Sequence, residues 1–327
     1  DWSSDVCSSD LVAESLLTAD FALRAASVPP VNVVMPHAAL AEAAGVPGMA
    51  NLLVSALAPE EAEQSLAAVL TPEDAGLLLE GGSSGTVVKA SRVFLPQGVA
   101  EALGQAGLAT SPATFHLADA FESGTNATPY GFVAALAPDG LGATPDLRDD
   151  EIVVNAWLAE ALSLQTNQTL TLRWRRFEAG GRLVADSRTF RVRAVVPTER
   201  AADIKRLMPV FPGLAGVDSC AVWDVGLPMD EAKLNDAANE AYWKQWRETP
   251  KAVVTYAAGR ACFGNAFGEA MCLQVAADEP RVRAALRSLA PARLGFAVRP
   301  LWAEGLVVAK GATDFKGLFV GLAFVLI

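Results

Sequence analysis

Histidine is almost absent from this chain, which has two among its 327 residues, His37 and His116. His37 follows Pro36 where a strand is expected to end, and His116 stands between Phe115 and Leu117. Both settings favour a structural or surface role over that of a catalytic base. The chain also lacks a Walker loop and a His-Glu-x-x-His motif. We therefore expect no catalytic residue, no cofactor and no enzymatic activity, so that any ATPase has to be another chain or domain.

Cysteine is scarce as well, and its spacing excludes the common metal sites. The sequence has four cysteines and no Cys-x-x-Cys pair. Cys7 falls in residues 1–11, which leaves an odd set of three, Cys220, Cys262 and Cys272. A zinc site is therefore not expected. An oxidising compartment would allow a Cys262–Cys272 disulfide, but we favour two buried thiols.

Positive charge is sparse, since the formal net charge is −11 and no lysine or arginine cluster occurs. A protein that binds nucleic acid needs basic residues facing the phosphates. Broad docking on anionic lipid headgroups needs the same kind of patch. The composition therefore excludes nucleic acid as a partner and argues against electrostatic docking on an anionic membrane.

Both ends of the sequence are unusual. Residues 1–11 match the translation of a common sequencing-library adapter, so we expect the natural chain to enter near Val12; the alternative is a polar N-terminal tail. Residues 314–327 run from Asp314 and Phe315 into an uncharged apolar stretch that begins at Gly317. A membrane helix needs about 20 apolar residues, so we expect 314–327 to be its start. The alternative is a buried C-terminal strand or core helix.

A weak internal repeat with an offset of about 220 residues predicts two related lobes. In each copy an apolar strand is followed by a small-residue stretch, a second strand and a helix with acidic residues and proline at its start. We therefore expect strands in the first copy at 31–36 and 51–54, and in the second at 251–256, 271–275 and 296–299. The helices would begin near Pro59 and Glu279. These lobes, a truncated first repeat at 12–80 and a second at 251–310, would form a β-α-β layer.

The residues between the two copies predict a small antiparallel barrel or sandwich. Residues 81–150 are expected to connect the lobes, with flexible loops at 81–85 and 138–150. Residues 151–250 are expected to form a β-rich lobe with a helical insertion at about 231–248. Its strands alternate apolar and polar residues with period two, and Gly180-Gly181 predicts a hairpin turn. These strands are expected at 151–155, 169–175 and 189–196, with a short helix at 157–162. The fold class is therefore α+β.

Three polar or aromatic groups have a functional and a structural interpretation. The acidic run Asp149–Glu151 is a solvated turn or, less favoured, a cation site. Arginines on the barrel strands would pair with acids across the sheet or meet an anionic headgroup. Aromatic residues at 242, 243 and 246 would pack in the core or face a substrate. In each case we favour the structural interpretation. The arginines concerned are Arg173, Arg175, Arg176, Arg191 and Arg193.

The order of segments from residue 150 onward resembles the extracytoplasmic region of FtsX-like permeases of ABC transporters, of the MacB-like type. The resembling pattern is a strand, then Asn-x-x-Leu-Ala-x-x-Leu, then two barrel strands. Thr166-Asn167-Gln168 stands where that family has a Gly-Asp pair, which keeps a turn-forming residue. The residues that carry the resemblance are Asn155, Leu158, Ala159, Leu162, Pro197, Pro209, Trp223, Trp243 and Pro250, followed by the membrane entry at Asp314, Phe315 and Gly317.

The resemblance implies a β-α-β porter-like layer and a β-rich lobe on the periplasmic side of the bacterial inner membrane. It also implies three partners: an ABC ATPase subunit or domain, a second permease copy in a dimer, and membrane lipid. ATP hydrolysis in the cytosol would be coupled to movement of a lipid, lipoprotein or other amphiphile. The alternative is a membrane-anchored binding or scaffold protein without ATPase coupling; a soluble hydrolase with a degenerate site is a third, weaker hypothesis.

Overall fold

The computed structural model describes residues 32–137, 146–177, 182–226 and 228–311. The chain divides into two compact units. Unit 1 contains residues up to 68 and residues from 297 onward, and unit 2 contains residues 69–296. The acid-rich turn, the barrel strands and most of the residues that carry the family resemblance belong to unit 2.

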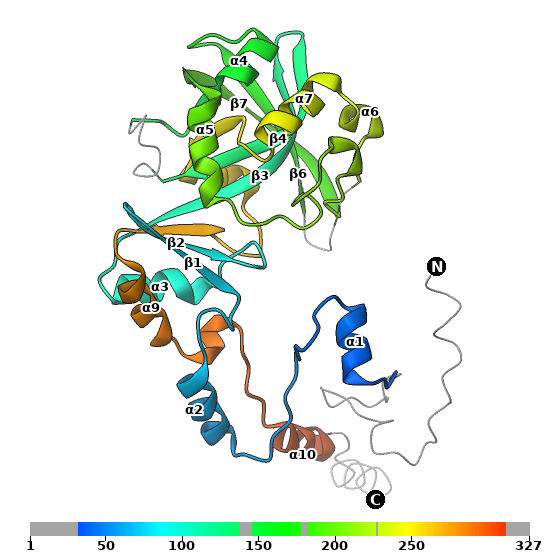
Figure 1. Ribbon diagram of the computed structural model, residues 1–327, viewed down its shortest axis with the longest axis vertical. Coiled ribbons are helices and arrows are strands. Elements are labelled where there is room, and N and C mark those ends of the chain that lie inside the picture. Colours follow the sequence, from blue (N-terminus) through cyan, green and yellow to red (C-terminus); the bar gives the residue numbers. More distant parts are fainter. Residues whose placement is uncertain (1–31, 138–145, 178–181, 227, 312–327) are drawn as a thin grey trace, which may run out of the picture. The chain divides into compact units, whose positions relative to one another are not determined.

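Unit 2 is built on a nine-stranded sheet in the order β1-β2-β9-β3-β4-β8-β5-β7-β6 (Figure 1). An additional pairing between β3 and β6 joins the last strand back to the fourth, so six strands close into a barrel. The barrel order is therefore β3-β4-β8-β5-β7-β6. The strands are β1 Leu77–Gly82, β2 Gly85–Ala90, β3 Thr110–Ser123, β4 Asn126–Leu136, β5 Glu151–Asn155, β6 Thr169–Phe177, β7 Leu183–Val196, β8 Ala252–Thr255 and β9 Cys272–Val275.

Alternate residues of all six barrel strands form one apolar cluster. The period-two pattern of a strand sends every second side chain to the same face, and the interior of a six-stranded barrel is filled by such side chains. Helix α4 (Ala156–Leu162) and helix α8 (Tyr256–Phe263) also contribute to this cluster. Its strand members include Phe121, Val133, Val154, Leu172, Phe190 and Val254.

The outer face of part of the barrel is covered by the chain between β7 and β8. This stretch contains α5 (Thr198–Ile204), α6 (Glu231–Leu234) and α7 (Ala237–Trp246). Its apolar side chains form a second cluster with residues of β3, β4, β5 and β8 that point outward. We call residues 198–249 the helical insertion. Its members in this cluster include Leu207, Met208, Trp223 and Trp243.

The sheet continues beyond the barrel through the pairing of β3 with β9. Strands β1, β2 and β9 are antiparallel neighbours there. Helices α3 (Gln97–Gln105) and α9 (Glu279–Arg287) lie together against this extension (Figure 1) and close a third apolar cluster with it. Unit 2 thus has a core on each face of its sheet.

Unit 1 contains α1 (His37–Ala43), α2 (Pro59–Val69, of which the last residue belongs to unit 2) and α10 (Leu301–Gly311). Ala41 is its one buried apolar residue among those described. Large apolar side chains are instead exposed, ten of them between Val33 and Leu57 and three in α10. No helix in the described part of the chain is both long enough and apolar enough to span a bilayer.

The α+β class is confirmed, and the structure has a barrel rather than a sandwich. The barrel is not antiparallel as predicted, because β8 runs parallel to β4 and β7 runs parallel to β5. The predicted strands at 151–155, 169–175 and 189–196 and the short helix after Asn155 are present. β6 and β7 pair antiparallel, as the hairpin prediction requires. Two further sequence features, the Gly180-Gly181 turn and the membrane entry at 314–327, lie outside the described residues, as do residues 1–11.

The predicted repeat is wrong at the level of its strands. Residues 32–36, 51–54 and 296–299 form no strand. The first two runs are apolar, but no neighbouring strand pairs with them, and an isolated strand leaves its backbone groups without partners. β8 and β9 are present as predicted, yet they are not neighbours in the sheet. β3 and β4 lie between them, and α8, which connects β8 to β9, contacts both of these strands.

Two other expectations need correction. Residues 81–85, predicted as a flexible loop, contain the turn of the β1–β2 hairpin, where Gly82 pairs with Gly85. The segment 81–150, predicted to connect the lobes, supplies β2 and the two long barrel strands β3 and β4. The helix expected at 231–248 is interrupted after Leu234, because Asn235 and Asp236 end α6 and begin α7.

Candidate functional site

Asn155 connects the end of β5 to the start of α4. Its backbone is extended, and its side-chain oxygen accepts a hydrogen bond of 2.8 Å from the amide of Leu158. This is a helix N-cap, which satisfies one of the free N–H groups of the first turn. The cap turns the chain so that Leu158, Ala159 and Leu162 enter the barrel cluster. Four of the family-motif residues therefore act together as one buried structural element.

The amide of Asn155 also reaches the helical insertion. Its Nδ2 donates to the hydroxyl of Tyr242 at 2.9 Å and to the carbonyl of Pro250 at 3.3 Å. The Tyr242 hydroxyl in turn donates to the carbonyl of Thr249 at 2.9 Å. Asn155 and Pro250 are far apart in the sequence, so this contact ties α4, α7 and the start of β8 into one site.

Lys251 continues this site at the point where β8 begins. Its backbone N–H donates to the carbonyl of Phe132, and its carbonyl accepts from the N–H of Asn155. The β4–β8 ladder starts at the next residue, where Ala252 pairs with Val133. The carbonyls of β4 before Phe132 consequently have no β8 backbone opposite them, and the side chain of Lys251 extends along them.

The ammonium group of Lys251 meets three oxygen atoms. Nζ donates to Asn239 Oδ1 at 2.6 Å, to the carbonyl of Tyr130 at 2.8 Å and to the carbonyl of Pro129 at 3.3 Å. A protonated lysine has three N–H donors, so each donor has an acceptor. The side chain is almost completely buried, with 1% of the residue exposed.

Three aromatic rings surround the same nitrogen. Its distances to the ring centroids are 4.4 Å for Trp157, 5.1 Å for Tyr242 and 5.8 Å for Phe121. Ring faces attract a cation. Gly131 leaves the space that the aliphatic chain occupies, since a Cβ there would lie 2.5 Å from Lys251 Cδ. We call this arrangement of oxygens and rings around Lys251 the lysine cage.

Among the residues that the structure describes, no carboxylate forms a salt bridge with the charged side chain of Lys251. Burial lowers the pKa of Lys251 to about 7, because removal from water disfavours the charged form; the nearby Cys220 and Asp236 oppose this. The oxygens and rings of the cage favour the ammonium. Burial and the cage therefore act in opposite directions on the pKa of Lys251, and burial has the larger effect.

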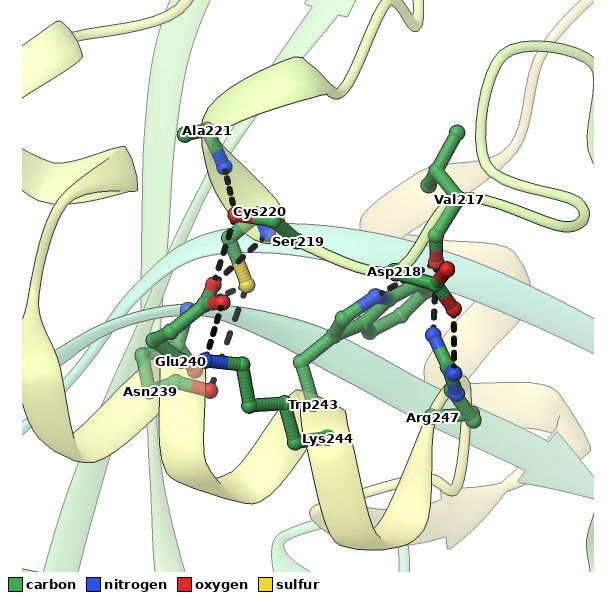
Figure 2. Close-up of polar contacts among 10 residues, drawn as sticks. All are labelled: Val217, Asp218, Ser219, Cys220, Ala221, Asn239, Glu240, Trp243, Lys244 and Arg247. Carbon is green, nitrogen blue, oxygen red and sulfur yellow. Dashed lines mark hydrogen bonds and ion pairs between the residues drawn. The ribbon is translucent and has the colours of Figure 1, made fainter.

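The α7 side of the cage is held by a polar network with residues 217–221 (Figure 2). Glu240 accepts from the amide of Cys220 at 2.8 Å and from the hydroxyl of Ser219 at 3.2 Å. Trp243 Nε1 and Arg247 both donate to the carbonyl of Val217. This network fixes the chain segment before the 3-10 helix Cys220–Val222 against α7.

Burial and hydrogen bonds shift the pKa values of this network in opposite directions. Desolvation alone would raise the pKa of Glu240, but the Cys220 amide, Lys244 and Ser219 lower it overall. Burial raises the pKa of the Cys220 thiol to about 12. The Cys220 sulfur lies 3.9 Å from the amide nitrogen of Asn239, whose oxygen accepts from Lys251. Cys220 thus contacts the same side chain, Asn239, that accepts a hydrogen bond from Lys251.

The remaining family-motif residues have structural positions in unit 2. Trp223 packs edge-on against Trp243, with centroids 4.7 Å apart. Pro197 ends β7 and precedes α5. Pro209 is buried in the helical insertion. Tyr242 and Trp243 are also buried, which confirms the core-packing interpretation for both. The membrane-entry residues Asp314, Phe315 and Gly317 lie outside the described residues.

The arginines of the barrel strands pair with acids, as the structural interpretation predicted. Arg175 forms a bidentate ion pair with Asp119 on β3. The other pairs join neighbouring strands or residues at their ends. They are Arg173 with Glu122, Arg176 with Asp186, and Arg191 and Arg193 with Glu151.

The acidic run Asp149–Glu151 divides into two environments. Asp149 and Asp150 are exposed, as expected of a turn, whereas Glu151 is buried and pairs with Arg191 at 2.7 Å. The hydroxyl of Thr255 donates to Asp149. No group of acidic, cysteine or histidine side chains in the described ranges has the arrangement of a metal site.

The two histidines are separate from the lysine cage. His37 is the first residue of α1, rather than the end of a strand, and its Nε2 lies 2.9 Å from the carbonyl of Met49. His116 lies on β3 and stacks on Phe263 at 4.3 Å. His116 is half-buried, and desolvation lowers its pKa to about 3 because it disfavours the charged ring.

Residues Gly81–Gly85 have the Gly-x-Ser-x-Gly spacing of a hydrolase nucleophile elbow. That motif requires a strand-to-helix turn, whereas this segment turns between two antiparallel strands. It is therefore a hairpin turn. Cys220, Cys262 and Cys272 are buried free thiols, which confirms the favoured interpretation over a Cys262–Cys272 disulfide.

Neither a protein-family model nor a curated protein matches this chain.

The sequence did not identify Lys251 or Asn239 as site residues. A lysine immediately before a four-residue apolar strand resembles a solvent-facing strand end. Lys251 is buried because Gly131 on another strand leaves space for its side chain and because aromatic rings from β3, α4 and α7 surround its nitrogen. Only the assembled fold brings those residues together, so no local pattern could have revealed the cage.

Proposed function

We propose that this chain is the extracytoplasmic region of an FtsX-like ABC-transporter permease and that it has no catalytic role. It would pass conformational change between a cytosolic ATPase and a lipid, lipoprotein or other amphiphile. Within that assignment, the barrel corresponds to the β-rich lobe. The extension β1-β2-β9 with α3 and α9 corresponds to the porter-like layer.

The observation that carries the proposal is the apolar surface of unit 1. Large side chains such as Val33, Leu53 and Trp302 are 80%, 91% and 82% exposed. Ten exposed large apolar side chains fall between Val33 and Leu57, and exposed apolar residues in such number favour contact with a protein or a membrane. A permease supplies both kinds of partner, namely its own membrane helices and lipid.

A second observation supports the family assignment. Asn155 and Pro250, which were selected by resemblance alone, contact each other directly at 3.3 Å. Leu158, Ala159 and Leu162 enter one core cluster behind that contact. Residues that resemble a motif are thus parts of one structural element.

The test is to read the gene beyond both ends of this sequence and to purify the complete protein in detergent. The proposal predicts further membrane helices and co-purification of an ABC ATPase whose ATP hydrolysis changes when the permease is present. A complete protein that binds no ATPase, with no ATPase gene nearby, would instead support the membrane-anchored scaffold.

Two matched substitutions sharpen this experiment. Leu53→Glu places a charge on the apolar surface of unit 1, and Leu78→Glu does the same at an exposed leucine of unit 2. The proposal predicts that Leu53→Glu reduces assembly with the permease partners while Leu78→Glu does not. If both variants assemble equally well with the partners, the exposed apolar residues of unit 1 do not support the proposal.

A further inference from the structure

The lysine cage lies where the helical insertion meets the barrel. β4 supplies two carbonyls, β3 supplies Phe121 and α4 supplies Trp157, whereas Asn239 and Tyr242 come from α7. The side chain of Lys251 therefore contacts both the barrel and the insertion. Any movement of α7 away from the barrel separates the lysine from an acceptor oxygen and a ring.

We propose that Lys251 makes the docking of the helical insertion on the barrel sensitive to pH, in that proton uptake by the buried amine weakens the docking. The inference concerns unit 2 alone and does not depend on the proposed function. It would hold equally for a transporter domain or a scaffold.

The direction follows from the difference between the buried and the released lysine. Burial lowers the pKa of Lys251 to about 7, whereas a lysine in water has a pKa of about 10.4. The released state therefore binds the proton more tightly. Between these two values, a fall in pH favours release, and a rise favours docking. Below pH 7 both states carry the proton, so the docking strength no longer changes.

The cage lets protonation of Lys251 weaken the docking of the helical insertion without unfolding the barrel. A buried ammonium without partners would be strongly unfavourable. Here three oxygens accept its three N–H groups and three rings face it, so the protonated lysine can stay inside the folded chain. Protonation thus shifts the balance between docked and released insertion without requiring the barrel to unfold.

Other titratable groups also face the lysine. Cys220 comes from the 3-10 helix before α7, Asp236 caps α7 and Tyr242 lies on it. Burial raises the pKa of Cys220 to about 12 and also raises the pKa of Tyr242, so neither group titrates in the range in which the docking changes. The acids of β3 nearest to Phe121 are engaged elsewhere, Asp119 with Arg175 and Glu122 with Arg173.

Cys220 provides the readout, because its buried sulfur touches Asn239. The experiment treats the whole chain with a thiol reagent at pH 6 to 8.5 and follows the Cys220 peptide by mass spectrometry. The rate for wild type is divided by the rate for Lys251→Met at each pH. This ratio cancels the intrinsic pH dependence of thiol reactivity, since methionine does not titrate.

The expected ratio is nearly constant from pH 6 to 7 and falls on the order of tenfold by pH 8.5.

Lys89→Met is the matched control, because Lys89 is a buried lysine with a carboxylate partner, Glu80, at 2.6 Å. The ratio of wild type to Lys89→Met should stay constant. If Lys251→Met does not fold, Lys251→Gln replaces it, because glutamine can still donate to the cage oxygens. A ratio of wild type to the Lys251 variant that stays constant within twofold overturns the proposal.

Discussion

The two units of this protein differ in the burial of their apolar side chains. Unit 2 distributes them over three clusters, one inside the barrel, one under the helical insertion and one between the extension and its helices. Unit 1, in its described residues, buries Ala41 and exposes thirteen large apolar side chains. Unit 2, in its described residues, exposes six, although it is more than twice as long. The difference indicates that unit 2 encodes its own core, whereas the described residues of unit 1 do not form one.

The sharpest way to test this difference is the same substitution in both units. Leu172→Ala removes a fully buried side chain from the barrel cluster, and we expect a loss of about 2 to 5 kcal/mol in the free energy of unfolding. Leu53→Ala removes a side chain that is 91% exposed, and we expect a change within about 0.5 kcal/mol. Urea unfolding of both variants measures the two values. Similar losses would show that unit 1 has a core of its own.

The next largest effect is expected at the cap that joins α4 to the helical insertion. Asn155→Ala removes the N-cap of α4 and leaves the carbonyl of Pro250 without a donor. We expect a loss of about 2 kcal/mol, the sum of a lost cap and an unpaired buried group. Asp230→Ala is the control, because Asp230 caps the short, exposed α6, and should cost about 0.5 to 1 kcal/mol. Thermal unfolding of both variants tests the ranking, and equal losses would contradict a central role for Asn155.

The smallest expected effects concern ion pairs. Arg175→Gln breaks a two-pronged contact in unit 2 whose side chains are 18% and 20% exposed, and we expect about 1 to 2 kcal/mol. Arg299→Gln breaks the pair with Glu304 in unit 1, where the side chains are 37% and 38% exposed. We expect less than about 0.5 kcal/mol there. Denaturant unfolding at low and high salt gives both values, and a larger loss for Arg299→Gln would reverse the comparison.

The sequence predicted much of the barrel because its strands carry their own signal. The alternation at 169–175 and 189–196 is local, so it predicts strands without knowledge of their neighbours. The same kind of signal failed at 32–36 and 51–54. Those residues are apolar enough for strands, but a strand also requires a neighbour to pair with, and that information is not local.

The candidate site was predicted in part. Asn155, Trp243 and Pro250 were named in advance, since they belong to a recognisable order of segments. Lys251 was missed, because its role depends on a glycine of β4 and on rings from three other elements. Closure of the barrel was also beyond the sequence pattern, because it rests on the pairing of β3 with β6 between residues far apart in the chain.

The most direct test of the account is hydrogen exchange of the chain alone, compared with the complete protein that the proposed permease function predicts, in lipid nanodiscs. We predict that peptides from 32–68 and 297–311 exchange more slowly in the complete protein, because a partner covers their apolar side chains. Peptides from the barrel and its extension, within 69–296, should exchange at the same rate in both samples. Equal exchange of the unit 1 peptides in the two samples would contradict the proposal that a partner covers the apolar side chains of unit 1.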